Sequence, residues 1–517
     1  MAEDDQIETI ALLGDPDTHD GQAVERVETH ASHVFLAGDR AYKLKRALRY
    51  SYLDYSTRPL RQAACERELE LNRRFAPGLY LGVKSVTRET DGTLTLGGQG
   101  RPVDWVLEMR RFSNADLFDQ MAQSGRLTPD LMARLAARIA DVHHAAPIVH
   151  DMGGEAGIAE AIETTRINLQ PGDAFGLPRI ERWHAAALST LAIQRDLLES
   201  RRQAGKVREC HGDLHLRNIC LFEGGPTLFD GIEFSRSIGC IDILFDLAFL
   251  LMDLHHRGLD DLGNLVFNRY LDLSDETEGL PLLPLFLSLR AGIRAQVTET
   301  MGRGLQNGAA RDRAMTEARS YLDLAIALLH PAEPRLVAVG GFSGTGKTTV
   351  ARGLAPMLPP IPGARTLRSD VIRKRLRGVT ETTRLPAEAY GPCSSAAVYD
   401  RLGEEAAATL EAGVSVVVDA VFARPEERRA VAELARSMEV SFDGVWLTAV
   451  PATLEARVSA RSGDASDATA VVVRRQVARG AGLIDWAIVD AGREPANSVA
   501  AAAEAIGTRS LPGERLS

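Results

Sequence analysis

The chain has 517 residues, of which 45% are hydrophobic and 25% charged; this length and ordinary composition predict several packed domains and exclude a disordered, collagen-like or coiled-coil chain. Sixty basic residues against seventy acidic ones leave a formal net charge of −10, which disfavours binding to nucleic acid or to an anionic membrane surface. The acidic start is unlike a secretory signal, no apolar stretch is long enough to cross a bilayer, and the five scattered cysteines lack metal-ligand spacing, so we expect a cytoplasmic protein without membrane spans.

The first part of the chain predicts a small mixed lobe followed by a helical lobe. Alternating side chains predict strands at 32–38 and 40–48, and helical periodicity predicts a helix near 58–75. Beyond these, long helical periodicity dominates. We therefore expect an α+β bilobal domain over residues 1–329, with its small lobe over 1–110 and its helical lobe over 111–329.

Turn residues are densest at 330–334, which we interpret as a linker. The apolar run at 336–341 directly after it predicts a buried strand, and from there strand patterns alternate with helical ones. Such alternation is typical of a parallel α/β sheet. We expect a second, α/β domain over residues 335–517.

A conspicuous motif of the first domain runs from His211 to Asn218, with the spacing H-x-D-x-x-x-x-N, and Asp230 follows twelve residues after Asn218. Phosphoryl transfer needs a carboxylate that accepts the proton of the attacking hydroxyl, and an amide oxygen with a second carboxylate to hold magnesium against nucleotide phosphates. Asp213 is our candidate base, and Asn218 and Asp230 are our candidate magnesium ligands.

A lysine on an early strand should complete this set by contacting the nucleotide phosphates and pairing with a glutamate on the next helix. Lys43 is our first candidate, and Lys45 is its rival because strand alternation places it on the same face. Glu68 is our choice for the pairing glutamate, with Glu66 second.

In these residues the chain from about 25 to 325 resembles the aminoglycoside phosphotransferase family, whose catalytic loop has the pattern HGDLHxxN. The resemblance implies a protein-kinase-like fold that uses ATP and Mg²⁺, and it implies that Asp246 braces the catalytic loop. Two features of protein kinases are missing: no G-x-G-x-x-G loop precedes Lys43, and no phenylalanine follows Asp230.

The second domain carries a complete G-x-x-x-x-G-K-T motif between a predicted strand and a helix. Its glycines let backbone N–H groups surround phosphate oxygens, its lysine reaches the β- and γ-phosphates, and its threonine is a magnesium ligand. The predicted nucleotide-binding residues are Gly341, Ser343, Gly344, Thr345, Gly346, Lys347, Thr348 and Thr349, with Thr348 also a metal ligand.

Further residues make this domain similar to the small P-loop kinases grouped with gluconate kinase and zeta-toxin proteins, in AAA-type ATP-binding domains. Asp370 and Asp419 each end a predicted strand, and Arg457 and Arg461 share one helix face. The resemblance implies that Asp370 is the base, Asp419 a magnesium ligand and the two arginines part of a lid over the phosphates. No N-K-x-D guanine motif occurs in this part, so ATP is the expected nucleotide.

We therefore expect an ATP- and Mg²⁺-dependent kinase with two nucleotide sites that phosphorylates hydroxyl groups of small molecules. A different hypothesis makes the P-loop domain a regulatory switch or toxin-like module that controls a single small-molecule kinase. A third makes one domain a non-catalytic interaction module, which the complete residue sets of both domains disfavour. The acceptor and the oligomeric state are not predicted, because pocket residues rather than fold decide the acceptor.

Overall fold

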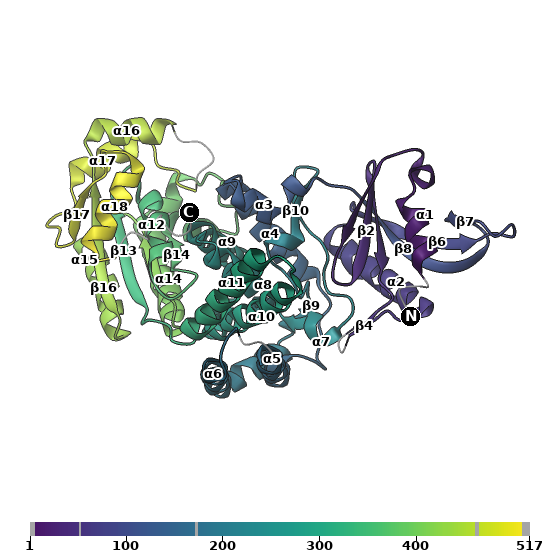
Figure 1. The fold of residues 1–517 in the computed structure, drawn as a ribbon. Helices are drawn as coiled ribbons and strands as arrows, with labels where there is room; N and C mark the ends of the chain where they lie inside the picture. Colours follow the sequence, from purple (N-terminus) through teal and green to yellow (C-terminus); the bar gives the residue numbers. More distant parts are fainter. Residues whose placement is uncertain (1–5, 51–52, 171–173, 461–464, 509–517) are drawn as a thin grey trace. The chain divides into compact units, whose positions relative to one another are not determined.

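The structure, a computed structural model, describes residues 6–50, 53–170, 174–460 and 465–508 (Figure 1). It divides into two compact units: unit 1 is Met1–Glu163 with Arg195–Asp253, and unit 2 is Thr164–Gln194 with Leu254–Ser517. The segment 330–334 lies inside unit 2. Each unit is a set of residues that pack compactly together, and its limits need not coincide with those of a functional domain. The domain limits expected from the sequence therefore remain a prediction.

Unit 1 contains a six-stranded antiparallel sheet of order β1-β2-β3-β8-β6-β7. Alternation along β3 buries Tyr42 and Leu44 in a hydrophobic cluster on one face and turns Lys43 and Lys45 to the other, where helix α2 packs. The strands are β1 (Val24–Glu28), β2 (Ser32–Ala37), β3 (Arg40–Lys45), β6 (Tyr80–Arg88), β7 (Leu94–Leu96) and β8 (Arg101–Arg110).

Short strand pairs frame the H-x-D motif of unit 1. The motif runs between β9 and β10; β9 pairs with β12, and β10 pairs with β11. The short strands are β4 (Arg49–Tyr50), β5 (Leu53–Asp54), β9 (Val207–Glu209), β10 (Ile219–Phe222), β11 (Gly225–Leu228) and β12 (Cys240–Asp242). The helices are α1 (Ile7–Gly14), α2 (Arg58–Phe75), α3 (Phe118–Gln123), α4 (Pro129–Ala145), α5 (Gly154–Leu169), α6 (Leu177–Gln203), α7 (Arg236–Gly239) and α8 (Ile243–His256), with α5, α6 and α8 each shared between the units.

Unit 2 contains a sheet of five parallel strands in the order β14-β15-β13-β16-β17, the layout of a P-loop α/β domain (Figure 1). Both faces are buried: Leu336 and Ala338 of β13 face one hydrophobic cluster, and Val337 and Val339 face another. This explains why β13 reads as a continuous apolar run. The strands are β13 (Arg335–Gly341), β14 (Arg365–Arg368), β15 (Val416–Asp419), β16 (Ser441–Thr448) and β17 (Ala487–Asp490).

The helices of unit 2 come from the sequence before residue 330 and from the sequence after it. Before it lie α9 (Asp260–Leu273), α10 (Leu283–Gly304) and α11 (Gly308–Leu328). After it lie α12 (Lys347–Leu354), α13 (Ser369–Arg375), α14 (Pro392–Glu411), α15 (Pro425–Ser437), α16 (Pro451–Ala460), α17 (Ala470–Arg479) and α18 (Pro495–Ala505). Among the described residues, no helix combines the length and the hydropathy needed to span a membrane. The parallel sheet expected for the second domain and the mixed lobe of strands and helices expected at the start of the first are both observed.

Candidate active sites

In unit 1, both candidate lysines contact Glu68. The ammonium nitrogen Nζ of Lys43 lies 2.8 Å from Glu68 Oε1, and that of Lys45 lies 2.5 Å from Glu68 Oε2. Glu68 is fully buried, whereas Glu66 is exposed and accepts a hydrogen bond from Gln62. The structure therefore pairs Glu68, not Glu66, with the lysine strand.

The second partners of the two lysines differ. Lys43 contacts Asp230 Oδ1 at 2.5 Å, and Lys45 contacts Glu233 Oε1 at 2.5 Å, with the Tyr55 ring 5.0 Å from its Nζ. Asp230 is the predicted metal ligand and is about half exposed, whereas Glu233 is buried. Lys43 thus faces the metal aspartate at the open side of the cluster, and Lys45 lies deeper, among Glu68, Glu233 and Tyr55.

The electrostatics of this cluster keep the two lysines and Glu68 charged. Burial acts to lower the pKa of Lys43, but the carboxylates of Asp230 and Glu68 outweigh it and hold the pKa well above its usual value. Burial likewise acts to raise the pKa of Glu68, yet the two ammonium groups lower it to about 2. Lys43 is therefore a permanent cation beside Asp230, as a phosphate-binding residue must be.

The backbone at Asp230 is fixed by residues that sequence reasoning missed. Asp230 has a left-handed φ of 61°, and its N–H donates to the hydroxyl of Tyr80 at 2.9 Å. The next N–H, of Gly231, donates to Asn72 Oδ1 at 2.8 Å, and a Cβ on Gly231 would lie 2.7 Å from the Phe75 ring. A side chain at residue 231 would therefore have to displace the Phe75 ring, which fits the absence of the phenylalanine of protein kinases.

The candidate base Asp213 is held by two side chains of its own loop. Asn218 Nδ2 donates to Asp213 Oδ2 at 2.7 Å, and His215 Nε2 lies 3.3 Å from the same oxygen. Because the amide nitrogen of Asn218 donates its hydrogen bond to Asp213, the amide oxygen of Asn218 is the atom suited to bind a metal. His215 Nδ1 accepts the N–H of Arg217 at 3.2 Å, which leaves Nε2 to carry the proton that faces Asp213. His215 was part of the motif, but only the fold shows that it orients Asp213.

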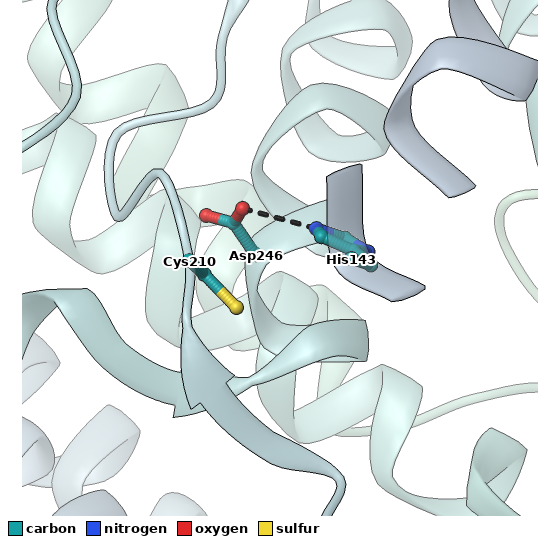
Figure 2. Close-up of side chains that lie close together, drawn as sticks. All are labelled: His143, Cys210 and Asp246. Atoms are coloured by element: carbon teal, nitrogen blue, oxygen red, sulfur yellow. Dashed lines mark hydrogen bonds and ion pairs between the residues drawn. The ribbon is translucent and has the colours of Figure 1, made fainter. Parts of the chain in front are cut away.

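Asp246 holds the backbone at the start of the loop from His211 to Asn218. Its Oδ1 accepts the N–H of Gly212 at 2.9 Å, and its Oδ2 accepts the N–H of His211 at 3.2 Å. Figure 2 shows the His143 ring hydrogen-bonded to the Asp246 carboxylate, at 3.2 Å, with the thiol of Cys210 beside them. This buried group has donor atoms near enough for a metal ion, but both Asp246 oxygens are engaged by main-chain N–H groups. We therefore assign it a bracing role.

His211 itself is a neutral, structural residue. Its Nε2 lies 2.8 Å from the carbonyl oxygen of Phe229, just before Asp230. Burial lowers the pKa of His211 despite the opposing effect of the nearby carboxylates, of which Asp246 acts most strongly. The imidazole thus links the catalytic loop to the segment that leads from β11 to Asp230, without carrying charge.

In unit 2, the predicted phosphate-binding loop joins β13 to α12. Gly341 has a φ of 139° and Gly344 a φ of 88°, and a Cβ on either would lie within 2.7 Å of a backbone carbonyl oxygen. Lys347 Nζ is 3.1 Å from the carbonyl oxygen of Phe342, and the N–H of Ser343 donates to Gln476 Oε1 of α17 at 2.8 Å. Gln476 was not foreseen, because 133 residues separate it from Ser343.

The predicted metal ligands of this loop meet. Thr348 Oγ1 donates to Asp419 Oδ2 at 2.6 Å, which joins the helix after the loop to the end of β15. Hydroxyl and carboxylate oxygens are the ligands that Mg²⁺ prefers, so the pair fits a magnesium site. An arginine that the sequence did not single out, Arg368 of β14, lies 3.4 Å from Thr348 Oγ1 and 3.6 Å from Asp419 Oδ2.

Asp370 is the second residue of α13, two residues after the end of β14, and it lies near Asp419, Lys347 and Arg368. Burial raises the pKa of Asp370 and the Asp419 carboxylate adds to this effect, while a hydrogen bond from Ser466 and the charges of Lys347 and Arg368 oppose it. A carboxylate with a raised pKa is a stronger proton acceptor, which suits a general base.

The remaining predicted nucleotide-binding residues are less informative. Thr349 is exposed. Arg457 of α16 donates to the carbonyl oxygens of Ala491 at 2.8 Å and Arg493 at 3.4 Å, beyond β17, so in this conformation it supports that loop. Arg461 lies outside the described residues. The lid role of both arginines remains a prediction.

Comparisons with known proteins match both parts of the chain. A model of the "Phosphotransferase enzyme family" matches residues 29–282, and an "AAA domain" model matches residues 336–483. The chain is therefore a kinase in which a phosphotransferase domain of the aminoglycoside phosphotransferase type precedes a P-loop AAA domain.

Uncharacterized proteins of Mycobacterium bovis and Mycobacterium tuberculosis are 31% identical over 473 residues, which cover 89% of this chain and 90% of theirs. The chain belongs to the same family as these proteins. Among solved structures, a choline/ethanolamine kinase family protein from Mesorhizobium loti matches 63% of this chain and 99% of its own, with 14% identity and a TM-score of 0.39. A gluconokinase from Sinorhizobium meliloti matches 34% and 92%, with 21% identity and a TM-score of 0.25.

Proposed function

We propose that the protein has two ATP- and Mg²⁺-dependent sites, each of which transfers the γ-phosphate to a hydroxyl group of a small molecule. The observation that carries the proposal is the position of Lys43, whose Nζ touches both Glu68 and Asp230, residues 25 and 187 positions away. This arrangement has the parts that phosphoryl transfer requires: a fixed cation for the phosphates beside a carboxylate for the metal.

At the first site, Asp213 accepts the proton of the attacking hydroxyl. His215 and Asn218 hold its carboxylate in place, so the base is oriented before the acceptor arrives. Lys43 neutralises phosphate charge, and the oxygens of Asn218 and Asp230 would hold Mg²⁺. When bound, the metal supplies charge neutralisation for the transferred group.

At the second site, the backbone N–H groups of the loop and Lys347 bind the phosphates, while Thr348 and Asp419 would hold Mg²⁺. Asp370, with its raised pKa, accepts the acceptor's proton. The presence of an acidic residue at position 370, beside Lys347 and Asp419, favours catalysis over the alternative in which the P-loop domain is only a regulatory switch. The five cysteines are free thiols, and four are buried, which supports our proposal of a reducing, cytoplasmic location.

The test is transfer of labelled γ-phosphate from ATP into an extract of small metabolites. Asp213→Ala should lower formation of one labelled product by at least about a hundredfold while leaving ATP binding nearly intact. Lys347→Ala should abolish a different product. Asp39→Ala and Arg429→Ala, at exposed positions of the two units, are controls and should leave both products unchanged.

Each outcome has a distinct meaning. Loss of two different products supports two independent kinase sites. Loss of the same product in both variants supports sequential sites or the switch hypothesis. If the wild-type chain labels no small molecule, the proposed acceptor class is wrong.

A further inference from the structure

Strand β14 forms one edge of the sheet in unit 2 and ends two residues before Asp370. An edge strand has a row of N–H and C=O groups that no neighbouring strand pairs. The N–H of Arg365 points toward β15 and donates to Ser415, so the N–H of Thr366 points to the open side. What occupies this open side is helix α9, which belongs to the phosphotransferase segment of the chain.

Helix α9 presents three polar side chains to β14, at positions 264, 268 and 272, one turn apart on a single face. Asn268 acts like a neighbouring strand: its Oδ1 accepts the N–H of Thr366 at 2.7 Å, and its Nδ2 donates to the carbonyl oxygen of Ala364 at 3.0 Å. Asn264, which is 4% exposed, adds a donor to the same carbonyl at 3.0 Å.

An ion pair made by a buried arginine reinforces this contact. Arg365, which is 4% exposed, donates to the main-chain carbonyl oxygen of Asn268 at 2.9 Å and to Asp272 Oδ1 at 2.5 Å. A buried guanidinium is costly unless its donors are satisfied, so α9 stabilises the position of β14 by providing acceptors for Arg365.

The contact between α9 and β14 bears on the P-loop site because β14 leads directly to residues of that site. Arg368 at the end of β14 is the register partner of Asp419 and lies near Thr348, and Asp370 follows at the start of α13. We propose that Asn268 is a positioning residue for the P-loop site: by completing the hydrogen bonds of β14, the phosphotransferase segment places Asp370 against the phosphate-binding loop. The catalytic consequence rests on the proposed function of that site; the docking of the strand does not.

The test uses the full-length chain with Asn268→Ala. Hydrogen exchange at the Thr366 amide should become about tenfold faster or more, because its acceptor is gone. The turnover number for the product that depends on Lys347 should fall about tenfold, since small displacements of catalytic groups are costly. The KM for ATP at that site and the product that depends on Asp213 should change less than twofold. A merely structural role would instead lower both products together.

Matched variants sharpen the result. Arg269 lies on the same helix as Asn268 and forms an ion pair with Glu381 in which both side chains are more than a third exposed. Arg269→Ala removes this ion pair and should affect neither exchange nor turnover. Asn268→Asp keeps an oxygen acceptor and should protect the Thr366 amide better than Asn268→Ala. If Asn268→Ala does not fold, Asp272→Asn, which weakens the anchor of Arg365, serves for the same measurements.

The proposal is overturned if Thr366 exchange and Lys347-dependent turnover both stay at wild-type levels in Asn268→Ala. Faster exchange with unchanged turnover would overturn the positioning role. If no product depends on Lys347 in the wild-type chain, the proposed function of the P-loop site fails, whereas faster exchange at Thr366 would still establish the docking of β14 on α9.

Discussion

Lys43 and Lys45 show how two identical side chains on one strand face acquire different tasks. Both share Glu68, but Lys43 has the half-exposed Asp230 as its other partner, and Lys45 has the buried Glu233. A lysine that must leave a carboxylate to bind nucleotide phosphates needs access to the nucleotide site. A lysine enclosed by carboxylates instead neutralises their buried charge and so stabilises the fold. We therefore assign phosphate binding to Lys43 and structural support to Lys45.

This assignment predicts opposite phenotypes for two variants. Lys43→Met should abolish the product that depends on Asp213 with a modest change in melting temperature. Lys45→Met leaves the buried Glu68 and Glu233 short of a cation and should destabilise unit 1 by about 3 kcal/mol or more. Calorimetric melting together with the transfer assay separates the two. A Lys45→Met variant that melts like the wild type and loses transfer would reverse the assignment.

At the scale of elements, helix α2 ties the lysine strand to the segment after β11. Glu68 holds both lysines of β3, and one helical turn later Asn72 accepts the N–H of Gly231, next to Asp230. The Phe75 ring of the same helix leaves little space for a side chain at residue 231. One face of α2 thus aligns residues from two distant parts of the chain, as the helical period requires.

The ion pairs of Glu68 with the two lysines predict that the folded protein loses stability as the pH falls. The pKa of Glu68 is about 2 in the folded protein against 4.5 ordinarily, so only the unfolded chain takes up its proton as the pH falls below about 4.5. The stabilisation from Glu68 is therefore complete at neutral pH and is lost progressively toward pH 2, at no more than about 1.4 kcal/mol per pH unit.

The measurement is the stability of unit 1 against denaturant between pH 7 and pH 3. Glu68→Gln should be less stable than the wild type at pH 7 and should lose stability less steeply below pH 4.5. Equal slopes in the two proteins would contradict a lowered pKa for Glu68.

At the scale of the whole molecule, two matched domains with separate residue sets predict two nucleotide sites. Calorimetric titration with a non-hydrolysable ATP analogue and Mg²⁺ should give two equivalents bound per chain. Lys347→Ala should reduce this to about one, because the loop loses its main cation for phosphate. A wild-type stoichiometry of one would leave a single working site and favour the regulatory hypothesis for the other.

The sequence by itself determined the class of fold and of enzyme, and the family comparisons confirm both. It could do so because the decisive signals are local. The spacing from Asp213 to Asn218 and the loop from Gly341 to Thr348 are each set within a few residues, where backbone geometry alone brings side chains together. The roles of the individual site residues remain predictions.

Only the tertiary structure decided which distant residues support those motifs. Tyr80 reaches Asp230 across 150 residues, Gln476 reaches Ser343 across 133, and Asn268 reaches Thr366 across 98. Such partners follow no periodicity along the chain. They are selected by how helices and sheets pack, because a buried backbone group takes its hydrogen bond from whichever side chain the packing brings within about 3 Å.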